Sequence, residues 1–291
     1  MEKFVTKNKL NVTEYFDKIL KSDYPLIMGI VNVTPDSFSD GGNYFNTNSA
    51  VEHAINLLDN GADIIDIGGE STRPGADPVS KEEECKRVIP VIKKLLKQRP
   101  GTIISVDTTK AEIAEKSLQA GAVIINDISA ATFDEKILDT VKKYNAFIVL
   151  MHIKGKPKTM QNVAVYDNVV SEVKDFLQKR IDTAKFYGIN KIIIDPGIGF
   201  GKRVFENYEL LKQIKYFAKL GYPILIGLSR KSFLGKALDL DVKNRENSTT
   251  IAEMFAIQNG VKIIRTHNVK NTKEIVKLLS FINNPKQLVN V

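Results

Sequence analysis

The sequence has little cysteine and no long apolar run. Its single cysteine, Cys85, stands in the charged string Glu82–Arg87 with no CxxC partner, so we interpret it as an incidental helix residue. No charged-then-apolar leader opens the chain, and no apolar stretch approaches the roughly 18 residues that span a bilayer. We therefore expect a cytoplasmic protein that does not act at a membrane, in which a reduced thiol is unremarkable.

Runs of basic residues are also missing. Lys and Arg number 42 against 34 Asp and Glu, which gives a formal net charge of +8. Such an excess favours anionic partners. Because the lysines are scattered and no recognition helix stands out, the sequence favours small anionic substrates and disfavours nucleic acid.

Short β-branched runs alternate with amphipathic segments from Pro25 onward, a pattern typical of βα units around a parallel sheet. Eight such runs predict an α/β protein with a single (β/α)8 TIM barrel over residues 25–291, rather than a doubly wound sheet. Residues 1–24 are expected to form an N-terminal extension packed on the barrel. The expected strands are Leu26–Val31, Asp63–Ile67, Ile103–Val106, Val123–Ile125, Phe147–Met151, Lys191–Ile194, Ile224–Gly227 and Val261–Ile264. Glycines that end the preceding helices are Gly61, Gly121, Gly188, Gly221 and Gly260.

Polar residues stand at the end of every expected strand. In chain order they are Asn32, Gly68-Gly69-Glu70, Asp107, Asn126-Asp127, His152, Asp195, Ser229-Arg230-Lys231, and Arg265 with His267. Any one of them is explained equally well as a helix cap or turn former. Because the carboxyl ends of barrel strands meet at one face, the complete set predicts a site there.

Asp107, Asn126 and Asp195 would bring carboxylate and amide oxygens into one pocket. A buried carboxylate needs a donor, which favours a flat ligand with an amidine-like N–H edge, such as a pterin or guanine. Structural ion pairs with barrel lysines and metal binding by the two aspartates are the alternatives.

Cationic and neutral donors end the remaining strands. Lys231 is suited to donate to a carbonyl and a ring nitrogen, and Ser229 to bind a carboxylate. Arg265 and His267, with Asn32, predict an anion pocket for a phosphate or diphosphate with Mg²⁺. The alternatives are a solvated basic turn and a structural histidine.

Two long loops, Val33–Asn43 and Ser71–Pro78, carry glycine and proline hinges, and Arg73 is a candidate clamp on substrate. The loop Asp195–Lys202 is rich in glycine but matches neither GxGxxG nor a Walker pattern. Phe200 within it is either an aromatic wall for a ring or a core residue.

Taken in order, these segments resemble motifs of the dihydropteroate synthase family over about residues 25–283. The matching segments are Met28–Gly42, Asp66–Gly75, Ser105–Thr108, Asn126–Ser129, Asp195–Lys202 and Gly227–Phe233. The resemblance implies a barrel, usually a homodimer, and a transferase of folate biosynthesis. That transferase joins 6-hydroxymethyl-7,8-dihydropterin diphosphate to p-aminobenzoate, which sulfonamides imitate, and releases diphosphate.

The resemblance also implies roles for individual residues. Residues that would hold the pterin are Asp107, Asn126, Asp195 and Lys231. Residues that would bind diphosphate are Asn32, Arg73, Arg265 and His267, with Asn32 also placing Mg²⁺. Residues that would border p-aminobenzoate are Thr72, Arg73, Pro74, Phe200 and Ser229. The residues predicted to be catalytic are Asn32, Arg73, Lys231, Arg265 and His267.

One motif departs from the family pattern. The family usually has Arg-Val-His-Asp where this chain has Arg265-Thr-His-Asn268, so the contribution of the aspartate is open. The chemistry implied is an SN1-like substitution with no dedicated general base, because the pterin can delocalise a methylene cation and a neutral arylamine attacks unaided. The nearest alternative is a pterin-binding methyltransferase on the same barrel, and a non-enzymatic binding protein is a more distant one.

Overall fold

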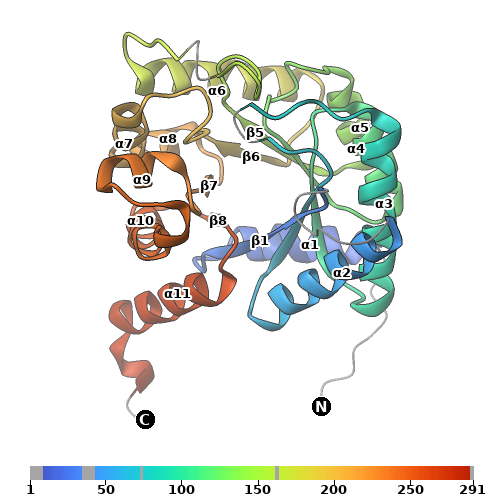
Figure 1. The fold of residues 1–291 in the computed structure, drawn as a ribbon, viewed down its shortest axis with the longest axis horizontal. Coiled ribbons are helices and arrows are strands. Elements are labelled where there is room, and N and C mark those ends of the chain that lie inside the picture. Colours follow the sequence, from blue (N-terminus) through green and yellow to red (C-terminus); the bar gives the residue numbers. More distant parts are fainter. Residues whose placement is uncertain (1–8, 35–42, 73–74, 161–163, 289–291) are drawn as a thin grey trace.

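The computed structural model describes residues 9–34, 43–72, 75–160 and 164–288, and within them it contains an eight-stranded parallel sheet (Figure 1). The strands are hydrogen-bonded in the order β6-β5-β4-β3-β2-β1-β8-β7. A bridge between Ile194 and Ile224 joins the two end strands, and the Ile194 N–H donates to the Pro223 carbonyl at 3.0 Å. The sheet therefore closes on itself, and the predicted (β/α)8 barrel is confirmed.

Each of the eight expected strands is present, with bounds shifted by no more than two residues. The strands are β1 (Leu26–Asn32), β2 (Ile64–Gly68), β3 (Ile103–Asp107), β4 (Ile124–Asp127), β5 (Phe147–Met151), β6 (Ile192–Asp195), β7 (Leu225–Gly227) and β8 (Ile263–Thr266). The α-helices are α1 (Lys9–Leu20), α2 (Asn43–Asp59), α3 (Lys81–Gln98), α4 (Ala111–Ala120), α5 (Lys136–Tyr144), α6 (Val169–Phe186), α7 (Val204–Lys212), α8 (Ile214–Phe217), α9 (Ser232–Leu238), α10 (Glu246–Gln258) and α11 (Val269–Asn283).

The five glycines predicted to end helices before strands have the backbone conformation expected of helix-ending residues. All five have positive φ, from 78° at Gly188 to 122° at Gly121. This left-handed region is disfavoured for residues that carry a Cβ, so glycine ends the helix there at little steric cost.

Apolar side chains alternate between two cores along each strand. Outward-facing residues such as Ile65 and Ile104 pack against the surrounding helices. Inward-facing neighbours such as Ile64 and Ile103 belong to a second group inside the barrel. This period of two leaves the strands buried on both faces, which explains why they read as continuous apolar runs.

Helix α1 packs against this inner group. Its residues Val12, Phe16 and Leu20 are buried among the inward-facing residues from the amino ends of the strands. Phe16 is 0% exposed and meets Phe147 of β5 edge to face, with ring centroids 4.7 Å apart. Burying such a side chain contributes about 1.5–3 kcal/mol. With that end filled by apolar groups, polar side chains gather at the carboxyl ends of the strands.

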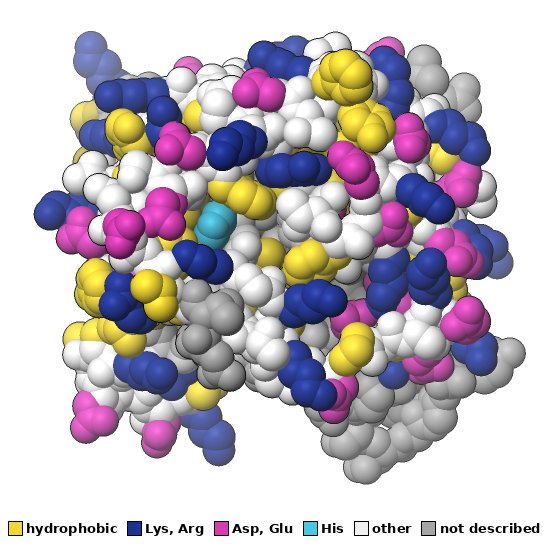
Figure 2. All heavy atoms as spheres, turned by 90° about the horizontal axis from the view of Figure 1, so that it is seen from above, with side chains coloured by type: hydrophobic (Ala, Val, Ile, Leu, Met, Phe, Trp, Pro, Cys, Tyr) yellow, Lys and Arg dark blue, Asp and Glu magenta, His cyan; other side chains and the backbone are white. Residues whose placement is uncertain are grey.

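Charged side chains are mixed over the surface. On the face drawn in Figure 2, Lys and Arg are interspersed with Asp and Glu instead of forming one basic patch. Within the described ranges, no helix is long and apolar enough to span a membrane.

One buried carboxyl group outside the barrel makes the stability pH-dependent. Glu253 of α10 is 1% exposed, and its burial raises its pKa to about 7. The Thr272 hydroxyl oxygen lies 2.7 Å from Glu253 Oε2 and 3.1 Å from the Asn268 carbonyl. Because a hydroxyl has one proton, a protonated Glu253 can donate to Thr272 while Thr272 donates to the carbonyl. The neutral form of Glu253 therefore suits this position.

We predict that Glu253→Gln reduces the stability loss that the parent protein shows as the pH rises from about 4.5 to about 7. The folded pKa lies above the unfolded value, so this stability is present below the unfolded pKa and is lost through the folded one. The difference amounts to about 3 kcal/mol in the free energy of unfolding. Urea unfolding of both proteins at pH 5 and pH 8 measures it, and parallel pH dependences would refute it.

Candidate functional site

An ion cluster occupies the centre of the barrel near the carboxyl ends of the strands. Arg265 of β8 donates from Nε to Asp66 Oδ2 of β2 at 2.6 Å, and from Nη2 to Asp107 Oδ2 of β3 at 2.9 Å. Asn126 of β4 donates from Nδ2 to the same Asp66 oxygen at 3.1 Å. Four strands thus contribute one polar side chain each to a single hydrogen-bonded group.

Asp66 is a member of this cluster that the sequence reasoning did not single out. It is 0% exposed and pairs in register with Ile30 of β1 and Ser105 of β3. The signal that points to it is a carboxylate inside the apolar run Ile64–Gly68, since a buried charge is retained only with partners. Asp66 holds Arg265 and Asn126 in place from below.

The electrostatics of the cluster favour a proton on Asp107. Burial raises the pKa of its carboxyl group; Arg265 opposes the shift, and the negative charge of Asp66 adds to it. Two carboxylates here share one guanidinium, so the second of them is only partly compensated. A ligand that donates hydrogen bonds to Asp107 would favour its ionised form.

Gly68 leaves space at the rim of the barrel. In register it stands between Asn32 of β1 and Asp107 of β3. A Cβ at Gly68 would lie 3.8 Å from Asn32 Oδ1 and 3.9 Å from Asp107 Oδ2. The missing side chain therefore leaves both oxygens bordering the same space.

Asp195 and Lys231 form a second part of the site. Asp195, at the end of β6, accepts from the Gly197 N–H at 2.7 Å, and burial raises its pKa. Lys231 donates to the Ile198 carbonyl and lies over the Phe200 ring, 4.6 Å from its centroid. Burial lowers the pKa of Lys231 to about 8, against the opposing attraction of Asp195.

The loop 195–202 is held by a buried lysine. Lys202, 3% exposed, donates from Nζ to the carbonyls of Gly197 and Phe200 at 2.7 and 2.9 Å, and lies 2.9 Å from His152 Nδ1. Gly197 has φ +68°, and a Cβ there would lie 1.9 Å from the His152 carbonyl oxygen, so only glycine fits. His152, expected at the mouth, is 5% exposed and supports the loop from behind.

The ring of Phe200 makes two kinds of contact. It faces Lys231, and it also packs, partly buried, against a small apolar group that includes Met151 and Met160. The ring is therefore fixed beside the ammonium group.

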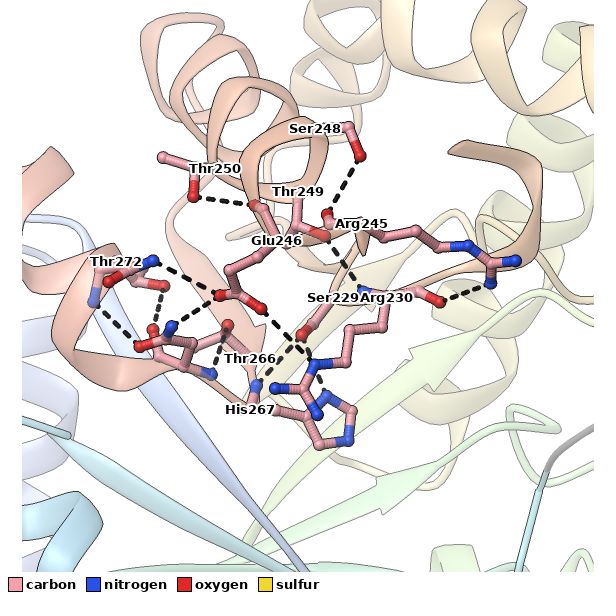
Figure 3. Close-up of polar contacts among 12 residues, drawn as sticks. Ser229, Arg230, Arg245, Glu246, Ser248, Thr249, Thr250, Thr266, His267 and Thr272 are labelled. Carbon is pink, nitrogen blue, oxygen red and sulfur yellow. Dashed lines mark hydrogen bonds and ion pairs between the residues drawn. The ribbon is translucent and has the colours of Figure 1, made fainter. Parts of the chain in front are cut away.

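Ser229 and His267 form a pair beyond β7 and β8. The Ser229 hydroxyl lies 3.0 Å from His267 Nδ1 and accepts from the His267 N–H at 3.3 Å (Figure 3). Arg265, expected with His267 in an anion pocket, has its guanidinium between Asp66 and Asp107. The two residues stand two positions apart but have separate partners.

The second loop is described only in part. Thr72 lies four residues beyond the end of β2 at Gly68, whereas Arg73 and Pro74 lie outside the described residues. Further along, the Gly75 N–H donates to the Pro157 carbonyl at 3.2 Å. This contact joins the second loop to the segment that follows β5. The expected role of residues 35–42 in the first loop also lies outside the described part.

Comparison with known proteins gives a consistent result. A family model for pterin binding enzymes matches residues 28–267. A dihydropteroate synthase of Synechocystis is 47% identical over 255 residues, covering 87% of this chain and 88% of that protein. The structure of Xanthomonas albilineans dihydropteroate synthase with 4-aminobenzoic acid has a TM-score of 0.84 at 42% identity, covering 90% of this chain and 94% of that one. The structure of that enzyme with 7,8-dihydropteroate has a TM-score of 0.81 at 39% identity, covering 90% and 95%.

We predict that Asp66→Asn lowers the pKa of Asp107, because it removes a repelling charge and keeps the side-chain volume. Asp127→Asn, whose charge has a smaller effect on Asp107, should lower it less. Carbon-detected NMR titration of labelled aspartate carboxyl groups measures both. An Asp107 pKa that is equal in the parent and in Asp66→Asn would contradict the prediction.

Proposed function

Because the chain belongs to the dihydropteroate synthase family of pterin-binding enzymes, we propose that it joins 6-hydroxymethyl-7,8-dihydropterin diphosphate to p-aminobenzoate. The products are 7,8-dihydropteroate and diphosphate. The observation that carries the proposal is the convergence of Asp107, Asn126, Asp195 and Lys231 on the barrel mouth, around the ion pairs of Arg265. A barrel with a purely structural role would not require these polar side chains at its mouth.

The pterin is held by complementary donors and acceptors. Asp107 and Asp195 accept from its amidine-like N–H edge, and Asn126 offers both a donor and an acceptor. Lys231 donates to the ring carbonyl and ring nitrogen. Support comes from the near-complete burial of both carboxylates, 7% and 6% exposed, because buried acceptors with few protein donors call for a ligand that supplies more.

The leaving diphosphate is held by Asn32, His267 and Arg265, with Arg73 of the second loop. Arg265 uses its Nε and one Nη for the two aspartates, and a guanidinium has five N–H donors, so the same side chain can also serve the anion. It would then connect the pterin site with the leaving group. Its ion pairs fix its orientation before substrate arrives.

Asn32 fits a magnesium site that is completed by substrate. Its amide oxygen is a ligand type that Mg²⁺ accepts, and it borders the space above Gly68. Among the residues described, no group of three or more His, Cys, Asp or Glu side chains could hold a metal ion. Phosphate oxygens and water would thus complete the coordination, and the bound ion would neutralise charge on the diphosphate.

The substitution proceeds by ionisation. The C–O bond to diphosphate breaks with its electron pair on oxygen, and the pterin delocalises the resulting methylene cation. The amine nitrogen of p-aminobenzoate then forms the C–N bond and loses a proton to solvent. Thr72, Arg73, Pro74, Phe200 and Ser229 border the amine substrate, and no side chain acts as a general base.

The assembly and the compartment are proposed on similar grounds. A homodimer is supported by exposed apolar side chains on the adjacent helices α10 and α11, among them Ile251, Phe255, Leu278 and Ile282. Covering such side chains against a second copy removes apolar surface from water. We also propose a cytoplasmic location, consistent with the single cysteine.

Diphosphate release tests the reaction directly. With Mg²⁺ and both substrates, we expect diphosphate and dihydropteroate to form in equal amounts, and diphosphate release to depend on p-aminobenzoate. Coupled phosphate detection and chromatography of the pterin product measure these. Methyl transfer from methyltetrahydrofolate without diphosphate release would favour the methyltransferase alternative.

We predict that Asp107→Asn weakens pterin binding by about 10- to 100-fold, the loss expected for a hydrogen bond to a charged group of about 1.5–3 kcal/mol. Ser105→Ala is the matched control, because Ser105 lies two residues earlier on β3 and is also buried. Calorimetry with a pterin ligand measures both affinities. Near-parental affinity in Asp107→Asn would remove Asp107 from the pterin site.

A further inference from the structure

A carboxylate lies directly behind the Ser229–His267 pair. Glu246, the first residue of α10, accepts from Asn268 Nδ2 at 2.6 Å, and its other oxygen lies 3.5 Å from Arg230 Nε (Figure 3). Asn268 directly follows His267, and Arg230 directly follows Ser229. One side chain therefore bridges the two turns that carry the pair.

The turn after β7 needs such support. Arg230 has φ +57°, a strained backbone conformation for a residue with a side chain. Its N–H donates to Thr249 Oγ1 at 3.1 Å, and its carbonyl accepts from Arg245 at 3.2 Å. Both partners stand at the start of α10 or just before it, so this helix end holds the turn between Ser229 and Lys231.

Asn268 uses both ends of its amide. Its oxygen accepts from the Asn271 N–H at 3.2 Å and caps α11, while its nitrogen donates to Glu246. An aspartate could cap the helix equally well, but it would set two carboxylates at hydrogen-bonding distance. Asn268, which departs from the Arg-Val-His-Asp pattern, therefore supplies a donor for the Glu246 carboxylate.

We propose that Glu246 and Asn268 are positioning residues for diphosphate binding, and that their amide–carboxylate hydrogen bond sets the placement of Ser229 and His267. This inference rests on the proposed function, because it takes His267 to bind the leaving diphosphate and Ser229 to border p-aminobenzoate. Neither Glu246 nor Asn268 needs to touch substrate. Their effect is transmitted through the adjacent residues of the two turns.

Exchanging the carboxylate of Glu246 and the amide of Asn268 tests the proposal. Asn268→Asp and Glu246→Gln should each weaken binding of inorganic diphosphate with Mg²⁺ about fivefold, the scale of coupling between residues in direct contact. The KM for pterin diphosphate should rise by a similar factor, and the KM for p-aminobenzoate should rise as well, because Ser229 borders that substrate. The double variant Asn268→Asp/Glu246→Gln should regain most of the affinity, because its new amide on α10 can donate to its new carboxylate before α11.

Matched controls come from the other side of the barrel. Asn168 caps α6 as Asn268 caps α11, and Glu172 in its first turn accepts from the Asn168 N–H at 3.1 Å. Asn168→Asp and Glu172→Gln should leave diphosphate affinity within twofold of the parent, by calorimetry. Circular dichroism and thermal unfolding verify that each variant is folded. If Asn268→Asp does not fold, the nearly isosteric variant Glu246→Gln tests the proposal in its place.

The outcomes separate the two proposals. Parental diphosphate affinity in both single variants, or a double variant no better than Asn268→Asp, overturns the positioning role. A parent protein that binds diphosphate but forms no dihydropteroate overturns the proposed function. In that case, the ratios of diphosphate affinity among the variants still decide the role of Glu246 and Asn268.

Discussion

The site depends on a guanidinium held between two buried carboxylates. Asp66 and Asp107 are 0% and 7% exposed, and an unpaired charge at such depth costs several kcal/mol. Arg265 compensates both, at 2.6 and 2.9 Å, and reaches them from β8 across β1. Because both carboxylates depend on this one guanidinium, the contact fixes the positions of β2, β3 and β8 at the rim, and the polar groups there cannot rearrange independently.

The inward-facing residues of each strand change character along its length. On β2 they are Ile64, Asp66 and Gly68, which are apolar, then charged, then without a side chain. On β3 the same face carries Ile103, Ser105 and Asp107. The apolar end meets α1, and the polar end surrounds the space above Gly68. One face of each strand therefore contributes to stability at one end and to binding at the other, as in other barrels of this type.

Most of the fold could be predicted from sequence because each βα unit repeats the same local signals. Apolar runs, helix-ending glycines and polar strand ends are read without knowing tertiary contacts. The partners of Arg265 could not be read in this way, since Asp66 is 199 positions away and i, i+2 spacing alone favoured a shared pocket with His267. The pairing of Asn268 with Glu246 likewise depends on how α10 packs against the turns. Local patterns identified Arg265 and His267 but not Asp66 or Glu246, and only the closed barrel assigns their partners.

The distribution of charge around the mouth bears on the reaction proposed. Acceptors lie on β2, β3, β4 and β6, while Arg265, His267 and Lys231 come from β8 or follow β7 and β8. A substrate that ionises separates a delocalised cation from a departing dianion or trianion, so charged groups that are already in place stabilise the transition state without reorganising. Side chains held by Asp66, Lys202 and Glu246 keep these groups in place. Catalysis by placement of fixed charge, and not by proton transfer, is what such an arrangement favours.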